Sequence, residues 1–226
     1  MIIVDSVSLN IRAKDILQTL RIGSQRKKEA ESIIEQGLKI ICPKAIYTFA
    51  KLEAIKKPIV KLNLGQPFNS IILSKMLKIG QVIALFVVTI GEKLEHEAHV
   101  QAKTSILNSW ILEQTGDFAL QVFSAQVKAQ IERALGGKVS SFNPGAGTGR
   151  LFSIDQQQVI FDILNPQSSI GVSLTSSCLM IPRKSVSGIY ATTSQEYVAC
   201  QYCPRQKCSN RKKPFKGETF SLNCET

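Results

Sequence analysis

The chain has 226 residues, of which 44% are hydrophobic and 20% are charged. This composition is ordinary for a globular protein and excludes a largely disordered or collagen-like chain. The 28 Lys and Arg against 17 Asp and Glu give a net charge of +11, which suits an anionic cofactor, an acidic protein or nucleic acid. Exposed aromatic residues are not interleaved with the basic ones, so we do not expect a nucleic-acid-binding protein.

The chain carries no predicted membrane segment or signal peptide. Its longest apolar run, VIALFVVTI at residues 82–90, is about half as long as a spanning helix requires. The N-terminus lacks a positively charged region, and Asp5 interrupts its short apolar run. We therefore expect a cytoplasmic protein whose cysteines stay reduced.

The first half of the chain alternates helical and strand patterns. Residues 26–41 have apolar side chains at helical spacing, and Pro43 follows. Residues 45–52 and 58–64 are short, β-branched or aromatic, and typical of strands. A short helix within residues 69–80, capped by Asn69 or Ser70, and a buried central strand at 81–90 are expected next.

Residues 91–135 are almost free of helix breakers and predict two long helices that meet near Gly116. Gly136 and Gly137 then end the second helix in the manner of a left-handed cap. The elements show no regular βαβ rhythm. The sequence therefore predicts an α+β fold: a single domain with a twisted, largely antiparallel sheet packed against long helices.

A loop rich in glycine and proline, SSFNPGAGTGR at residues 140–150, follows the predicted helices. Without side chains at Gly145, Gly147 and Gly149, its backbone could approach a ligand closely. The loop matches neither GxxxxGK[ST] nor GxGxxG, so a nucleotide phosphate loop is not expected. Plain turn chemistry remains the alternative.

Residues 140–190 resemble a known family. The ordered matches are the Pro144–Gly145 loop and then Gln158, Phe161, Leu164, Gly171, Leu174, Thr175, Met180, Pro182, Ser185, Ser187 and Gly188. This pattern resembles the activation domain of cobalamin-dependent methionine synthase, and more closely the stand-alone activation-domain-like proteins of anaerobes. A weaker similarity extends it over most of residues 30–195.

The resemblance implies a function and partners. In the full enzyme this domain binds S-adenosylmethionine and closes over the cobalamin module, so that oxidised cobalt can be reduced and remethylated. By resemblance, this chain is an accessory protein of corrinoid-dependent methyl transfer. Its partner would be a cobalamin-binding methionine synthase or corrinoid protein, with a low-potential electron donor as a further candidate. The resemblance does not decide whether the chain is itself an enzyme.

The resemblance also implies a set of S-adenosylmethionine-binding residues. These are Ser141, Asn143, Pro144, Gly145, Ala146, Gly147, Arg150, Tyr190 and Gln121. Ser141 and Ala146 stand where the family has Arg and Tyr, and Gln121 stands where it has a carboxylate. Arg150 could replace the missing guanidinium, which grips a ligand carboxylate through charge-assisted hydrogen bonds. The alternative is a non-catalytic metal- or iron–sulfur-binding module that has kept the fold and lost the ligand site.

Six cysteines complete the inventory of chemically reactive residues. Cys200, Cys203 and Cys208 form a CxxCxxxxC pattern, with Cys224 as a candidate fourth ligand. Such thiolates suit zinc or an iron–sulfur cluster, and free or redox-active thiols are the alternative. We expect an activation-domain-like region at residues 1–197 and a basic, Cys-rich segment at 198–226. Cys42 and Cys178 are expected to be buried.

Overall fold

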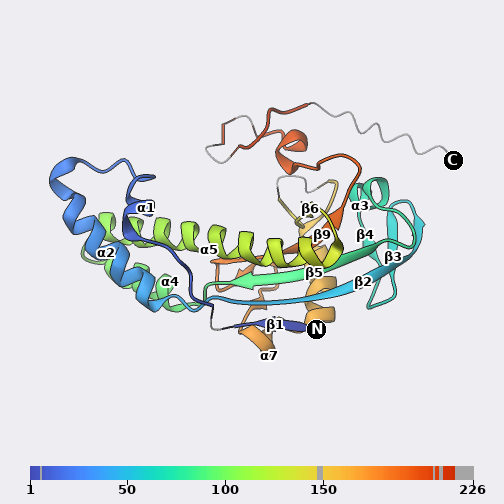
Figure 1. Ribbon diagram of the computed structural model, residues 1–226, viewed down its shortest axis with the longest axis horizontal. Helices are drawn as coiled ribbons and strands as arrows, with labels where there is room; N and C mark the ends of the chain where they lie inside the picture. The colour runs from blue at the N-terminus through green and yellow to red at the C-terminus, as the bar shows by residue number, and fades with distance from the viewer. Residues whose placement is uncertain (6, 147–149, 206, 209–210, 217–226) are drawn as a thin grey trace.

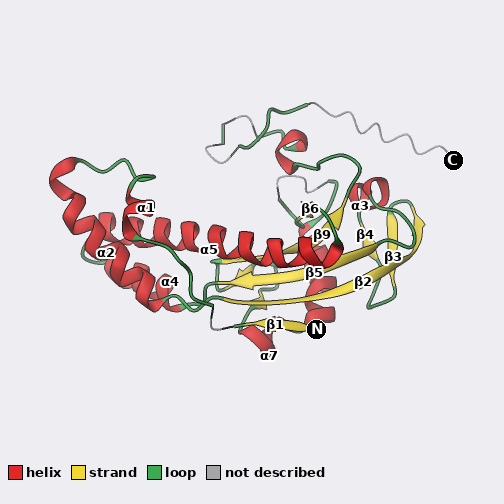
Figure 2. Cartoon of the chain, in the orientation of Figure 1, coloured by secondary structure: helices red, strands yellow, loops and turns green. Residues whose placement is uncertain are grey.

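A seven-stranded antiparallel sheet forms the centre of the fold in this computed structural model (Figures 1 and 2). The structure describes residues 1–226 except 6, 147–149, 206, 209–210 and 217–226. The strands run in the order β4-β3-β2-β5-β9-β6, and β1 pairs with β2. Their bounds are β1 (Ile2–Val4), β2 (Lys44–Lys56), β3 (Ile59–Leu62), β4 (Phe68–Asn69), β5 (Val82–Thr89), β6 (Val139–Phe142) and β9 (Ser185–Thr192), with a separate hairpin of β7 (Ser173–Leu174) and β8 (Met180–Ile181).

Helices cover both faces of this sheet. Their bounds are α1 (Ala13–Leu17), α2 (Lys27–Ile40), α3 (Ile71–Met76), α4 (Lys93–Gln101), α5 (Ile106–Leu135), α6 (Gln157–Leu164) and α7 (Pro166–Ile170), with 3-10 turns η1 (Ser24–Arg26), η2 (Ile154–Gln156) and η3 (Ala199–Tyr202). Because side chains alternate along a strand, β5 serves two cores. Phe86 and Val88 pack with α5, whereas Leu85 and Val87 pack with α6 and α7. The predicted α+β fold is confirmed.

The N-terminal half of α5 extends beyond the sheet and carries a helical arm (Figure 1). At 1.5 Å per residue, this 30-residue helix is about 45 Å long. Helices α1, α2 and α4 pack around its first half, with Ile34 and Ile111 in one buried cluster and Leu94 and Leu112 in another. No helix in the described part of the chain is both long and apolar enough for a membrane span.

The predicted break between the long helices was misplaced. Gly116 lies inside α5, and the break occurs at residues 102–105, where Ser105 caps α5 by accepting the Asn108 N–H at 3.2 Å. Gly116 favours close packing, because a Cβ there would lie 2.9 Å from a Leu94 methyl group, which would have to shift. The other predicted helices and strands are confirmed, including the Ser70 cap of α3 and the left-handed Gly136 after α5.

Cys42 and Cys178 are not buried as predicted. Cys42 is exposed after α2, and Cys178 is half-buried in the turn before β8 with a positive φ of 57°. Their apolar sequence neighbours were misleading, because both cysteines lie in connections rather than inside a strand or helix.

Candidate functional site

A chain of polar side chains joins β6 to β9 at the edge of the sheet. Ser141 is the register partner of Tyr190 across the two strands, so the two side chains are neighbours. Ser141 Oγ donates to Asn143 Oδ1 at 2.9 Å, and Asn143 Nδ2 donates to the Ser187 carbonyl at 2.8 Å. Three residues predicted from the family pattern therefore lie together: Ser141 and Asn143 are hydrogen-bonded, and Tyr190 lies beside Ser141 on the next strand.

Tyr190 is a buried phenol at this edge. Its ring stacks on Phe86 with centroids 4.0 Å apart. Burial raises the pKa of Tyr190 to about 12, against the opposing effect of the neighbouring Ser141 hydroxyl. The phenol therefore stays neutral at physiological pH and can act as a hydrogen-bond donor there.

The Pro144–Gly145 turn is held by backbone hydrogen bonds. Gly145 has a φ of 73°, and its N–H donates to the Phe152 carbonyl at 2.9 Å. The Ala146 N–H donates to the Asn143 carbonyl at 3.3 Å. Arg150 is exposed at the far end of the loop, whereas Gly147, which we predicted to be a binding residue, lies outside the described residues. The turn thus extends directly from the Ser141–Asn143 group.

Gln121 is exposed on the side of α5 that runs along this edge. It shares a stripe of the helix with Asp117, Ser124 and Glu132, which are four, three and eleven residues away. Asp117 Oδ1 lies 2.6 Å from Lys184 Nζ just before β9, and Glu132 Oε1 accepts the Val139 N–H of β6 at 3.0 Å. Ser124 Oγ is buried and has no hydrogen-bond partner among the described residues. Those predicted positions that the structure describes therefore lie along one edge formed by β6, β9 and α5.

The SxSG pattern in β9 is explained by local packing. Ser185 Oγ lies 2.7 Å from the Pro182 carbonyl and 2.9 Å from Thr89 Oγ1. At Gly188, a Cβ would lie 2.6 Å from the Phe142 carbonyl oxygen and 2.7 Å from Asn143 Nδ2. Ser185 therefore fastens the start of β9 to β5, and Gly188 lets β9 lie close to β6, so their first role is to position the strand.

The sequence reasoning missed Gln157, which is 4% exposed. Its Oε1 accepts a hydrogen bond from Ser187 Oγ at 2.6 Å, and its Nε2 donates to the Cys178 carbonyl at 2.6 Å. It therefore ties α6 to β9 and to the turn before β8. The family pattern was matched at the neighbouring Gln158, which is exposed.

A charged cluster fastens the start of β9 to the helical arm. Lys184 Nζ lies 2.7 Å from Glu113 Oε2 and 2.6 Å from Asp117 Oδ1. Arg183 bonds to Glu95 Oε1 at 2.6 Å and to Glu113 Oε1 at 2.9 Å. Burial raises the pKa of Glu113, but Lys184 and Arg183 together outweigh it, so the pKa stays below its usual value. The Glu95 hydrogen bond raises the pKa of Arg183 despite partial burial.

The predicted metal ligands lie in the C-terminal segment. Cys200 is in η3, and Lys212 N–H donates to its Sγ at 3.4 Å. Arg211 donates to the carbonyls of Cys200 at 2.7 Å and Cys203 at 3.1 Å, and it also donates to the Arg205 carbonyl. In the described part of the chain, no group of three or more His, Cys, Asp or Glu could hold a metal ion. Cys224 lies outside the described residues.

The start of this segment contacts the domain. Tyr197 is buried and stacks on Phe142 with centroids 4.7 Å apart, and Tyr202 stacks on Tyr197 at 5.6 Å. Tyr197 N–H also donates to Ser140 Oγ at 3.0 Å. The chain after residue 197 therefore begins packed against the same core as β6.

Comparisons with known proteins agree with this architecture. The crystal structure titled "Crystal Structure of the MetH Reactivation Domain bound to AdoHcy" is similar, with a TM-score of 0.61 and 14% sequence identity, over 87% of this chain and 79% of that chain. A search of curated proteins finds no match. The family model "Vitamin B12 dependent methionine synthase, activation domain" matches residues 66–213, which include the edge and Cys200, Cys203, Cys208 and Arg211. The chain therefore belongs to the family of vitamin B12-dependent methionine synthase activation domains.

Proposed function

We propose that this protein is a cytoplasmic accessory protein of corrinoid-dependent methyl transfer. It would dock on a cobalamin-carrying methionine synthase or corrinoid protein and support reactivation of the cobalt. The family membership supports this proposal, and the basic chain, with its net charge of +11, suits an acidic partner or electron donor. Copurification with a cobalamin-binding protein, or a change in its corrinoid absorbance on mixing, is the corresponding test.

The edge formed by β6, β9 and α5 is the proposed S-adenosylmethionine site. The single observation that carries this assignment is the Ser141–Asn143–Tyr190 group, which leads directly into the Pro144–Gly145 turn. The similar structure, that of the MetH reactivation domain, was solved with AdoHcy bound. Here the Tyr190 phenol, the Ser141 hydroxyl and the backbone around Ala146 supply neutral hydrogen-bonding groups.

Without a guanidinium at residue 141 the site should bind S-adenosylmethionine weakly, because Ser141 cannot pair with the ligand carboxylate as an arginine would. We expect Ser141→Arg to tighten binding about 10- to 100-fold, the size of one added charge-assisted pair. Isothermal titration calorimetry with S-adenosylmethionine and S-adenosylhomocysteine measures this change.

Ser153→Arg is the matched control, since Ser153 is exposed beyond the turn and gains the same charge. It should leave the affinity within about twofold, because an exposed charge is screened by solvent. Circular dichroism shows whether each variant folds. Absence of binding in the native chain and in a folded Ser141→Arg variant would favour a module that has lost the ligand site.

The second candidate function is a metal- or iron–sulfur-binding module built on Cys200, Cys203 and Cys208. The described thiols do not assemble three ligands by themselves, so the proposal requires Cys224 or an outside ligand. The Lys212 N–H that meets Cys200 Sγ favours it, because backbone N–H groups stabilise thiolates in such sites.

Iron and zinc analysis of anaerobically purified protein tests the metal proposal. We expect about one zinc ion or one cluster per chain, and its loss in Cys200→Ser. Cys42→Ser is the control, since Cys42 is exposed after α2, outside the C-terminal segment. A native chain without either metal would leave the thiols as free or redox-active groups.

A further inference from the structure

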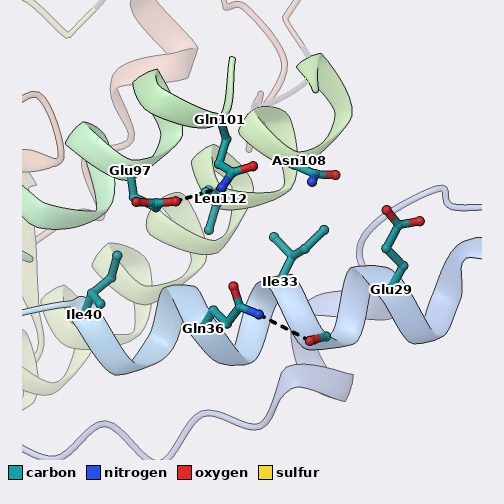
Figure 3. A pocket seen from close by; sticks show the side chains of 9 residues that line it. Glu29, Ile33, Gln36, Ile40, Glu97, Gln101, Asn108 and Leu112 are labelled. Carbon is teal, nitrogen blue, oxygen red and sulfur yellow. Dashed lines mark hydrogen bonds between the residues drawn. The ribbon is translucent and has the colours of Figure 1, made fainter. Parts of the chain in front are cut away.

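The helical arm contains a groove that is separate from the proposed S-adenosylmethionine site. It has a volume of about 590 Å³ and lies between α2, α4 and the start of α5 (Figure 3). This volume is within the usual range for small-molecule sites. The groove is therefore large enough for an organic ligand.

The polar lining of the groove accepts hydrogen bonds and carries negative charge. Glu29 and Gln36 come from α2, Glu97 and Gln101 from α4, and Asn108 from α5. Gln101 Nε2 donates to Glu97 Oε1 at 2.9 Å, which leaves the second carboxylate oxygen and the Gln101 carbonyl for a ligand. None of the described lining residues is Lys or Arg, although the chain has a net charge of +11.

Apolar side chains separate the two carboxylates. Figure 3 shows Leu112 and Ile33 between Glu97 and Glu29, with the amides of Gln101 and Asn108 along one side. Glu29 and Gln36 are seven residues apart on α2, which is about 10 Å along the helix axis. The groove thus has a carboxylate toward each end and apolar side chains between them (Figure 3).

Close helix packing fixes the wall of this groove. At Gly37 of α2, a Cβ would lie 3.0 Å from a Leu112 methyl group and 3.1 Å from a Leu94 methyl group. The glycine therefore lets α2 lie close to α4 and α5. Because these contacts are buried, the lining side chains project from a rigid frame rather than from a loop.

We propose that this groove binds a linear diamine or polyamine. Each terminal ammonium would meet one carboxylate, Glu29 or Glu97, and the amide oxygens would accept its remaining N–H groups. The methylene chain would lie over Ile33 and Leu112. Lys27 and Lys28 precede Glu29 on α2 but do not line the groove, and solvent screens exposed charges at about 0.15 M salt.

Spermidine is the probe, titrated by calorimetry into the full chain at 0.15 M NaCl. We expect a dissociation constant below about 1 mM, and about tenfold weaker binding in each of Glu29→Gln and Glu97→Gln. The monoamine n-butylamine should bind at least about tenfold more weakly than spermidine, because it engages one carboxylate.

Glu35→Gln is the matched control. Glu35 is exposed on α2 and does not line the groove, so its loss should leave the spermidine affinity within about twofold. Equal weakening in Glu35→Gln and Glu29→Gln would show non-specific attraction and overturn the proposal. Absence of spermidine binding to the native chain would also overturn the proposal. A groove that accepts only a lysine side chain of a protein partner would give this result. S-adenosylmethionine binding is measured separately, so failure here leaves the proposed function unaffected.

Discussion

Replacing Lys184 by methionine is expected to lower the free energy of unfolding by about 2–3 kcal/mol. The Lys184 side chain is 11% exposed and bonds to Glu113 and Asp117. Its removal leaves the Glu113 carboxylate partly buried with only Arg183 as a cationic partner. The cost is below that of a fully buried pair, because the Asp117 side chain is 59% exposed and can be hydrated. Urea unfolding measures the change.

Arg183→Gln is the control, because it removes an exposed cation from the same charged cluster. The Arg183 side chain is 65% exposed, so solvent screens its ion pairs and we expect a loss of at most about 1 kcal/mol. If Arg183→Gln proved as damaging as Lys184→Met, burial would not be the property that makes this cluster important.

The Lys184 variant should also change how stability depends on pH. In the folded protein the pKa of Glu113 is lowered from its usual 4.5, because Lys184 and Arg183 outweigh the effect of burial. The stabilisation is therefore complete above the unfolded pKa and is lost as the pH falls through the lowered folded value. In Lys184→Met the loss of stability at acid pH should therefore be smaller. Unfolding midpoints measured from about pH 6 to about pH 3 test this expectation.

Much of the fold follows from local sequence. The continuous apolar run of β5 predicts a strand buried on both faces, and Gly136 adopts the left-handed conformation expected after a helix. Gly116 was misread because a helix tolerates a glycine when a neighbour needs the space. Leu94 occupies that space, and the real break depends on the Ser105 cap, a weaker signal than glycine.

The candidate site was predictable only in part. The loop at Pro144–Gly145 could be recognised from its composition and from the family pattern, because both lie within one short stretch. Gln157 could not, since its partners Ser187 and Cys178 are 30 and 21 residues away. Nothing in a local window distinguishes a buried Gln157 from an exposed Gln158. Such contacts form only when α6 packs on the sheet, so a local stretch of sequence does not reveal them.

Gly188→Ala is expected to destabilise the protein by about 2–3 kcal/mol and to weaken the proposed S-adenosylmethionine site. The added methyl group would lie 2.6 Å from the Phe142 carbonyl oxygen. That oxygen belongs to β6, which the pairing with β9 holds in place, so relief requires the two strands to separate. Asn143 Nδ2, at 2.7 Å, would also be displaced from the Ser187 carbonyl.

Gly137→Ala separates this steric effect from the general effect of removing a glycine. A Cβ at Gly137 would meet only a Thr192 methyl group at 3.7 Å, an ordinary contact, so this variant should be neutral or stabilised by a few tenths of a kcal/mol. Urea unfolding and calorimetry with S-adenosylmethionine give the two readouts. If Gly188→Ala kept native stability but lost the ligand, the glycine would act on the ligand directly. If it lost stability and kept the ligand, the edge formed by β6 and β9 would not be the binding site.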